Sequence, residues 1–391
     1  RQAWDLNSRL LSRTDDLGNT TMNEWDALDR RKRETFANGT FNTWIHDRND
    51  NILTFRDANN SVRTCAYDLI DRPIFCQVQR GAGVVGTTEQ SLEYDGRGLT
   101  TRSTDNNEPL DASDDAVVTC AYDSLSRKLE EHQILGGNDQ VVSFGWQDDD
   151  LRRDLTYPNG RKVGATFDGL DRLKTLSNLS GQPKNGLLAS WEYIGPGRVL
   201  SRSYPNGVVL QAEYDGDQRI SAWKHLKGGA ILAGFAYTHD RKSNILSEER
   251  LHAQNKDLWV YDSLYRLAEQ KRNVHAKTGK VEEERSWALD GAGSWASVQI
   301  TPKNKAPITL TQTMDSLNAY TAFAGTAQVE DLDGNKMDDG QYLYRWDFLH
   351  RLCEVLRKAD NALVSTALYD ATGSQGLNGS GRRVRKTVLN S

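Results

Sequence analysis

The chain has 391 residues, with 49 basic and 54 acidic side chains and a net charge of -5, which gives no electrostatic basis for binding nucleic acid or an acidic membrane surface. Apolar residues make up 37% of the chain, a fraction too low for a thick hydrophobic core. No run approaches the ~20 consecutive apolar residues of a membrane helix, so neither a nucleic-acid partner nor a membrane span is predicted.

An aromatic residue followed by aspartate recurs along the chain, from Trp4-Asp5 to Tyr369-Asp370. Early copies begin at positions 4, 25, 46 and 67, and roughly 16 units of about 24 residues account for the whole length. Such self-similarity is typical of a repeat architecture. We therefore predict that residues 1–391 form a single array of about 16 units. Because the pattern is already under way at the first residue, we expect a fragment of a longer chain.

Each unit is predicted to contain a strand, a turn, a second strand and a second turn. The second turn is clearest at 36–39, 157–160 and 204–207, where Asn-Gly is a strong hairpin signal. Ahead of the aromatic residue, apolar and polar residues alternate with a period of two, as in 162–168 and 208–214, which indicates a strand.

The first turn of each unit, here called the Asp turn, begins at the aspartate that follows the aromatic residue. The carboxylate of this aspartate can accept a hydrogen bond from the backbone two residues on. Five residues after the aromatic residue an arginine recurs, as at Arg127, Arg172 and Arg266. We expect the aspartate and the arginine to pair across the turn and to fix the register of the hairpin.

One face of the predicted strands carries a ladder of apolar and aromatic residues, among them Trp44, Leu92 and Ala212. About 32 strands cannot remain one open sheet, because strand twist accumulates until the sheet curls or closes. The predicted fold class is therefore all-β, with tandem antiparallel β-hairpins that form a long coiled sheet, a hollow β-shell or tube.

Two cysteines, Cys65 and Cys76, flank one Asp turn almost symmetrically and can face each other across a hairpin. The pattern leaves open whether they form a disulfide or a contact between two small apolar groups. Cys120 occupies the same repeat position as Cys65 and has no obvious mate.

Gly81, Gly83 and Gly86 are spaced like a dinucleotide-binding fingerprint. The residues that follow lead directly into the next aromatic-Asp pair and leave no room for the helix that such a site needs. We predict a glycine-rich hairpin loop here instead.

The seven histidines are scattered, without a paired acid or a metal-ligand spacing, and most aspartates belong to turns. No catalytic, cofactor-binding or metal-binding residue is predicted. The chain is accordingly predicted to use no cofactor and not to be an enzyme.

Several units resemble the Tyr-Asp (YD) repeat of RHS proteins, and the resemblance covers essentially all of 1–391. The stretch 331–347 resembles the part that comes late in the family's arrays. This chain departs from the family by often placing Asp, Ser, Tyr or His where the family has glycine before the arginine. The units that carry the resemblance most clearly are Tyr122-Asp123-Ser124-Leu125-Ser126-Arg127, Phe167-Asp168-Gly169-Leu170-Asp171-Arg172-Leu173 and Tyr261-Asp262-Ser263-Leu264-Tyr265-Arg266-Leu267.

This resemblance implies a function, because RHS arrays form a hollow β-shell around a polypeptide, commonly a C-terminal toxin. The predicted function is a non-catalytic structural RHS-repeat shell that encapsulates or displays a polypeptide cargo from the same parent chain. The implied location is secreted or on the cell surface, and the implied source is bacterial. The family's Asp-Pro-x-Gly type self-cleavage motif and a toxin domain are not found in the sequence.

The alternative is an extracellular cell-surface adhesion or glycan-binding module, in which exposed tryptophans serve as platforms for sugars. Trp44, Trp191 and Trp259 share the ladder face. Inward packing of these rings favours the shell, whereas rows of solvent-exposed rings favour the glycan-binding module.

Asp331, Asp333, Asn335 and Asp339 have the one, three, five, nine spacing of a calcium loop. The twelfth position is Tyr342 rather than glutamate, and the family's turn accounts for the same residues. Calcium binding therefore remains open here. Residues 372–381 are predicted to be a flexible linker.

Overall fold

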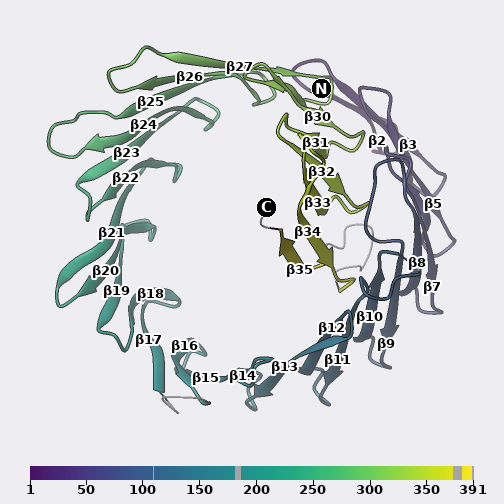
Figure 1. The fold of residues 1–391 in the computed structure, drawn as a ribbon, viewed down its shortest axis with the longest axis horizontal. Coiled ribbons are helices and arrows are strands. Elements are labelled where there is room, and N and C mark those ends of the chain that lie inside the picture. The colour runs from purple at the N-terminus through teal and green to yellow at the C-terminus, as the bar shows by residue number, and fades with distance from the viewer. Residues whose placement is uncertain (109, 181–185, 373–380, 390–391) are drawn as a thin grey trace. The chain divides into compact units, whose positions relative to one another are not determined.

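The computed structural model describes residues 1–108, 110–180, 186–372 and 381–389, and the predicted linker 372–381 lies almost entirely outside them. The described residues form strands, turns and loops (Figure 1). None of them belongs to a helix long and apolar enough to cross a membrane. The predicted all-β class of tandem antiparallel hairpins is confirmed.

The strands form two sheets, one of 29 strands (β1–β29) and one of six (β30–β35). The total of 35 exceeds the predicted 32 because short strands occur between residues 326 and 338. By its contacts the chain divides into two compact units, with Arg1–Val141 and Gln312–Ser391 in unit 1 and Val142–Thr311 in unit 2. That residues 1–391 form one array of about 16 repeats stays a prediction.

Unit 1 contains twenty complete strands. They are β1 (Gln2–Trp4), β2 (Leu10–Thr14), β3 (Thr20–Trp25), β4 (Arg31–Thr35), β5 (Phe41–His46), β6 (Ile52–Arg56), β7 (Val62–Tyr67), β8 (Pro73–Gln79), β9 (Glu89–Tyr94), β10 (Thr100–Asn106), β11 (Ala116–Tyr122), β12 (Lys128–Leu135), β28 (Tyr320–Phe323), β29 (Thr326–Ala327), β30 (Val329–Glu330), β31 (Lys336–Asp338), β32 (Tyr342–Trp346), β33 (Leu352–Arg357), β34 (Leu363–Tyr369) and β35 (Arg383–Val388).

Unit 2 contains thirteen complete strands, and two more, β13 (Asn138–Trp146) and β27 (Ile308–Met314), contain the boundaries of the units. The thirteen are β14 (Arg152–Thr156), β15 (Lys162–Phe167), β16 (Leu173–Asn178), β17 (Gly186–Ile194), β18 (Arg198–Ser203), β19 (Val208–Tyr214), β20 (Ile220–Lys227), β21 (Ala230–His239), β22 (Ile245–Arg250), β23 (Asn255–Tyr261), β24 (Leu267–His275), β25 (Glu283–Leu289) and β26 (Trp295–Pro302).

The Asp turn between β15 and β16 shows how one aspartate builds the hairpin. Asp168 Oδ1 accepts hydrogen bonds from the backbone N–H groups of Leu170 and Arg172, at 2.9 and 3.1 Å, and its Oδ2 accepts the Arg172 Nε–H at 2.7 Å. The hydrogen bond from the Arg172 guanidinium lowers the pKa of Asp168 to about 2. The predicted Asp–Arg pair is therefore present, and it fixes the turn in one geometry.

Each Asp turn ends in a β-bulge. The strand register shifts at the aromatic residue, for example between Thr166 and Phe167, and the residue before the arginine has a left-handed backbone, as Asp171 does with φ at 60°. A four-residue turn followed by a bulge is a common hairpin connection, and the bulge increases the local twist of the strands. Ser126 and Tyr265, which replace the family's glycine, keep the same conformation, with φ values of 68° and 62°.

The arginines also reach the next repeat, which the sequence did not predict. Arg219 Nη1 donates to the carbonyl oxygen of Asp240 at 2.8 Å, and Arg266 Nη1 donates to that of Asp290 at 2.7 Å. Some guanidinium groups also lie over the aromatic ring of the following repeat, as Arg172 does over Tyr193 at 4.5 Å from the ring centroid. Arginines such as Arg219 and Arg266 thus join two consecutive Asp turns.

The aromatic residues connect repeats in the opposite direction. Tyr214 Oη donates to the Val199 carbonyl oxygen at 2.8 Å, and Tyr261 Oη donates to that of Ile245 at 3.0 Å. Trp25 does the same through Nε1 to Leu10 at 3.0 Å. In every case the acceptor lies at the start of the strand that follows the preceding Asp turn. Neighbouring hairpins are therefore joined by side chains as well as by the strand ladder.

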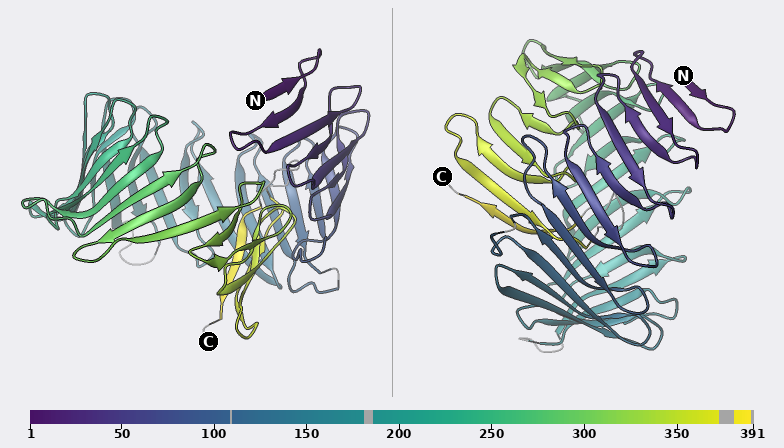
Figure 2. Two further views of the ribbon diagram at one scale, coloured as in Figure 1. Left: turned by 90° about the horizontal axis from the view of Figure 1, so that it is seen from above. Right: turned by 90° about the vertical axis from the view of Figure 1, so that its right-hand side faces the viewer.

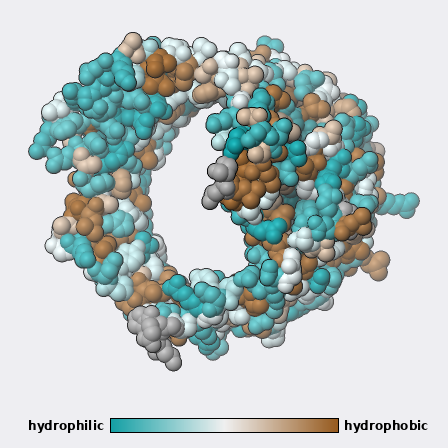
Figure 3. Space-filling model, viewed as in Figure 1, coloured by the Kyte–Doolittle hydropathy of each residue, from teal (hydrophilic) through white to brown (hydrophobic). Residues whose placement is uncertain are grey.

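The predicted second turns are present, with Gly39, Gly160 and Gly207 in left-handed backbone at φ values between 78° and 85°. The apolar ladder is only partly buried. Leu92 and Ala212 are 7% and 3% exposed, but most ladder residues are half-buried. Apolar and hydrophilic residues are interspersed over the surface seen in Figure 3, which agrees with the low apolar content of the sequence.

We predict that the substitution Tyr214→Phe lowers the free energy of unfolding by about 1 kcal/mol, because it removes one hydrogen bond and leaves the ring in place. Tyr265→Phe is the matched control, since Tyr265 is 53% exposed. Urea denaturation measures both variants. Equal stabilities for the two variants would contradict a role for the phenol hydroxyl in joining repeats.

Candidate functional site: a buried polar junction in unit 1

Unit 1 brings together two segments that are far apart in sequence. The Asp turns that begin at Asp315, Asp331, Asp347 and Asp370 contact loops and strands of the first 131 residues. Figures 1 and 2 show β30–β35, in yellow, beside the dark strands of the N-terminal repeats. We call this set of contacts the junction.

Two second turns of the N-terminal repeats form one part of the junction. Asn318 Nδ2 donates to Asp15 Oδ2 at 2.9 Å, and this hydrogen bond is the main cause that lowers the pKa of Asp15 to about 2. In the next contact, the Asp333 carboxylate accepts hydrogen bonds from the backbone N–H groups of Ala58 and Asn59, at 3.1 and 3.2 Å. Both contacts join an Asp turn to a second turn.

The centre of the junction is a buried charged cluster. Arg351 is 8% exposed, and its Nε donates to Asp347 Oδ2 at 2.6 Å while its Nη2 donates to Thr87 Oγ1 at 3.0 Å. Asp105 is fully buried and accepts hydrogen bonds from Thr87 Oγ1 at 2.6 Å and from Gln90 Nε2 at 2.9 Å. Arg351 Nη2 lies 3.6 Å from Asp105 Oδ2. One guanidinium therefore serves carboxylates from both sides of the junction.

A second arginine extends this network to β12. Asp370 is fully buried and accepts the Arg382 Nε–H at 3.0 Å and the Arg382 backbone N–H at 2.8 Å. Arg382 Nη1 forms an ion pair with Glu131 Oε1 at 2.7 Å. Arg351 Nη1 donates to the Asp370 carbonyl oxygen at 3.3 Å, so the two Asp turns share one hydrogen-bonded network.

The glycine-rich segment forms the loop between β8 and β9, as predicted, and the loop belongs to the junction. The Val85 backbone N–H donates to the Trp346 carbonyl oxygen at 2.9 Å. Gly86 has a φ of 77°, and a Cβ atom there would lie 3.0 Å from Asp347 Cβ and from Cys353 Sγ. A Cβ on Gly81 would collide with the Asn59 carbonyl oxygen. Gly86 thus permits the close approach of the two segments of the junction, and Gly81 permits the loop to lie against the second turn at 57–61.

The calcium-like spacing at residues 331–339 serves the turn and the junction. Asp331 Oδ1 accepts hydrogen bonds from the backbone N–H groups of Asp333 and Asn335, at 3.0 and 2.8 Å. Asp339 Oδ2 accepts the Tyr344 hydroxyl at 2.7 Å. Among the described residues no group of three or more histidine, cysteine or acidic side chains is placed to hold a metal ion. The residues therefore fit a turn, which was one of the two interpretations.

The structure decides between the two possibilities for the cysteine pair. Cys65 and Cys76 are directly opposite across β7 and β8 and form a disulfide. Cys120 and Cys353 are free thiols. Burial raises the pKa of the Cys353 thiol well above its usual range.

Burial also raises the pKa of carboxyl groups in the junction. The pKa of Asp105 rises to about 6 because the group is removed from water. Asp57 reaches about 6 through burial and the nearby charge of Asp333, and the pKa of Asp333 is itself raised, chiefly by burial. Asp26, the aspartate of an Asp turn outside the junction, shows the opposite shift, because the hydrogen bond from Arg30 lowers its pKa to about 2.

The sequence analysis did not identify Thr87, Gln90, Asp105 or Arg382 as members of a site. Their partners lie up to 264 residues away, so no local pattern could reveal the contacts. The sequence feature that could have pointed to the junction is the glycine-rich segment, because its residues depart from the repeat pattern. The prediction that the chain has no catalytic residue stays a prediction.

Comparison with protein-family models gives no match, and no curated protein matches either. Solved structures do match. A crystal structure of TcdB2-TccC3-Cdc42 matches with a TM-score of 0.80 and 14% sequence identity, over 99% of this chain and 22% of that chain. A Photorhabdus luminescens Tc holotoxin pore matches with a TM-score of 0.81 and 14% identity, over 100% of this chain and 21% of that chain.

These matches show the fold, in support of the RHS-like architecture expected from the sequence. The chain spans about a fifth of the length of the chains it matches. The junction is thus part of a fold that also occurs within much longer Tc toxin chains.

We predict a pH dependence that depends on Asp57. Since its pKa is about 6 in the folded protein, against about 4 in an unfolded chain, its stabilising contribution is present below pH 4 and is lost as the pH rises through 6. Between pH 5 and 7, the free energy of unfolding should fall by about 1 kcal/mol more in the wild type than in Asp57→Asn.

Denaturation at a series of pH values measures this difference. Asp57→Asn keeps an acceptor for the Ser61 backbone N–H, which Asp57 Oδ1 binds at 2.7 Å. Asp16→Asn, at an exposed aspartate, is the control and should keep the wild-type profile. Identical profiles for the wild type and Asp57→Asn would contradict the prediction.

A second prediction concerns the central guanidinium. Arg351→Met leaves Asp347 and Asp105 buried without their cation, so we expect the free energy of unfolding to fall by about 3 to 5 kcal/mol. Arg345→Met is the matched control on the neighbouring strand. Arg345 pairs with Glu354 at an exposed position, where the loss should be about 0 to 1 kcal/mol. Similar losses in both variants, measured by urea denaturation, would contradict the special role of Arg351.

Proposed function

We propose that this chain is a non-catalytic segment of an RHS-type shell, whose parent chain encloses or displays a polypeptide such as a C-terminal toxin. The observation that carries the proposal is the junction, where the strands at residues 329–388 lie against the N-terminal repeats through ionic contacts, of which the one between Arg351 and Asp105 is buried. The buried charges and the repeated turn geometry serve the assembly of a wall, which suits a protein that keeps an enclosed polypeptide away from solvent.

The solved structures support this proposal through their fold. They are structures of TcdB2-TccC3 and of a Photorhabdus luminescens Tc holotoxin pore, so the matched fold occurs in bacterial toxin complexes. By this analogy the partner of the chain is a polypeptide from the same parent chain, and the location is secreted or on the bacterial cell surface. Closure of the sheet into a hollow shell belongs to the same proposal.

A cavity in unit 2 is consistent with a polypeptide partner. It has a volume of about 530 Å³ and is half open to solvent. Leu155, Val163, Phe167 and Leu176 line it, together with the charged residues Asp150, Arg152 and Asp154. This mixed lining suits an extended polypeptide that presents both apolar and polar side chains.

The alternative glycan-binding function needs rows of exposed tryptophan rings. The ten tryptophans all lie among the described residues, and Trp4, at 55%, is the one that is exposed. Trp44, Trp191 and Trp259 are half-buried. We therefore expect acrylamide to quench the tryptophan fluorescence only weakly. The burial of the tryptophan rings favours the shell over the glycan-binding module.

Protease protection of the parent polypeptide tests the proposal. We expect the enclosed segment to survive native digestion with proteinase K in the wild type and in Arg345→Met. In Arg351→Met, which weakens the junction, we expect the segment to be degraded at least tenfold faster. If the segment in the wild type is degraded as fast as in a chain that lacks the repeats, containment is overturned. If the protein binds to a glycan array and this binding is lost when Trp4 is substituted, the glycan-binding alternative is favoured.

A further inference from the structure

The disulfide lies in the hairpin that carries two contact segments of the junction. The open end of this hairpin is the pair of Val62 on β7 and Gln79 on β8. The second turn at 57–61 precedes Val62, and the glycine-rich loop follows Gln79. The Ser61 side chain accepts the Gly81 backbone N–H at 3.2 Å, which connects the two segments. Cys65 and Cys76 therefore fasten the hairpin three residues from its open end, between the two segments that contact the junction.

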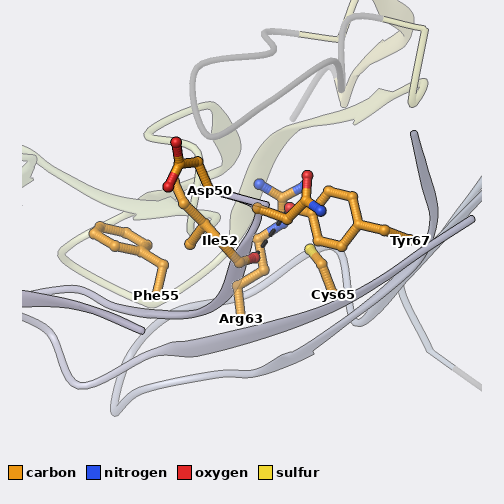
Figure 4. A pocket seen from close by; sticks show the side chains of 7 residues that line it. Asp50, Ile52, Phe55, Arg63, Cys65 and Tyr67 are labelled. Atoms are coloured by element: carbon orange, nitrogen blue, oxygen red, sulfur yellow. Dashed lines mark hydrogen bonds between the residues drawn. The ribbon is translucent and has the colours of Figure 1, made fainter. Parts of the chain in front are cut away.

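A pocket opens beside this disulfide (Figure 4). It has a volume of about 190 Å³, is half open to solvent, and is lined by Cys65 together with Phe55, Tyr67 and Ile52. Arg63 also lines it, although this side chain is only 5% exposed overall. Cys65 is 7% exposed in total, and the pocket lies beside this residue, where a small molecule can approach it.

Arg63 makes the two sulfur atoms of the disulfide chemically unequal. Its Nη2 lies 3.2 Å from Cys76 Sγ, whereas Cys65 is the cysteine that borders the pocket. A thiolate that leaves during exchange is stabilised by an adjacent cation, and a more stable leaving thiolate leaves faster. The arrangement favours attack at Cys65 and departure of Cys76.

We propose that Cys65–Cys76 is a thiol-exchange site, at which a low-molecular-weight thiol reduces the disulfide in the folded protein and thereby loosens the junction. The thiolate of the reductant attacks Cys65 Sγ, the Cys65–Cys76 bond breaks, and Cys76 leaves as a thiolate beside Arg63 and then takes a proton from solvent. A second thiol attacks the mixed disulfide, releases Cys65 as a thiol and departs as the oxidised reductant. Two thiols thus supply the two electrons that reduce the bond.

The loosening follows from the position of the bond. Without the disulfide, the turn at 57–61 and the loop at 80–88 are held in register by the backbone pairing of β7 and β8 and by the hydrogen bond between Gly81 and Ser61, with no covalent link. Cys353 reports on this change, because it is 8% exposed and its sulfur lies against Gly86 of that loop. Its rate of alkylation should rise when the loop separates from β33.

The experiment treats the folded chain with 2-mercaptoethanol and then with iodoacetamide, and reads the modified cysteines by peptide mass spectrometry. We expect Cys65 and Cys76 to be reduced at a rate proportional to the thiol concentration, while amides of unit 2 keep their protection from hydrogen exchange. Alkylation of Cys353 should then rise at least fivefold. The double variant Cys65→Ser with Cys76→Ser should show the same rise without any reductant.

Two variants test the role of the arginine. Arg63→Gln should slow the reduction about tenfold, because the leaving thiolate loses its cation, whereas Arg63→Lys should remain within about twofold of the wild type. If only global unfolding exposes the disulfide, it cannot be reduced faster than the most protected amides of unit 2 exchange their hydrogens. Equal rates of reduction and of this exchange would therefore overturn the proposal. Unchanged alkylation of Cys353 after full reduction would overturn the link to the junction.

Discussion

The structure depends on the hydrogen bonds between an aspartate and an arginine four residues later. The carboxylate fixes two backbone N–H groups and the guanidinium, and the guanidinium donates to the carbonyl oxygen of the next Asp turn, as Arg219 does to Asp240. The pair itself is half-buried, and an isolated ion pair that solvent still reaches contributes little to stability. The pair is important for geometry, because it fixes the position of the β-bulge, the register of the two strands and the distance to the following hairpin.

The same chemistry explains how so few apolar residues suffice. Strand ladders satisfy the backbone, and Tyr and Trp side chains donate to carbonyl oxygens of the preceding repeat, so neighbouring hairpins are joined without a thick core. In some turns asparagine takes the place of arginine. Asn51 and Asn244 donate through Nδ2 to the aspartate of their own turn, at 2.9 and 2.8 Å. The turn at Asp315 forms with Ala319 at this position, through backbone N–H groups that donate to the carboxylate, so the aspartate is sufficient for the local turn geometry.

The junction uses the Asp turn for a second purpose. Asp347 and Asp370 are buried, and the arginine bound to each of them also binds a group from a distant part of the chain. The arginine contributes little at the surface but is essential for stability in the junction, because a buried carboxylate must keep its cationic partner. In unit 1 one repeated element thus forms both the lateral connection between hairpins and the contact between separate parts of the chain.

The sequence by itself determined the all-β class, the strand and turn order and the Asp–Arg pairs, because all of these follow from contacts within about 24 residues that recur in every repeat. It also placed Cys65 opposite Cys76 and identified the glycine-rich loop. Only the tertiary structure decided which turns are buried, what Asp105 and Arg351 bind, and why Gly86 must lack a side chain. The reason is physical: these contacts join residues about 250 positions apart, and in a periodic sequence any two repeats satisfy the local pattern equally well.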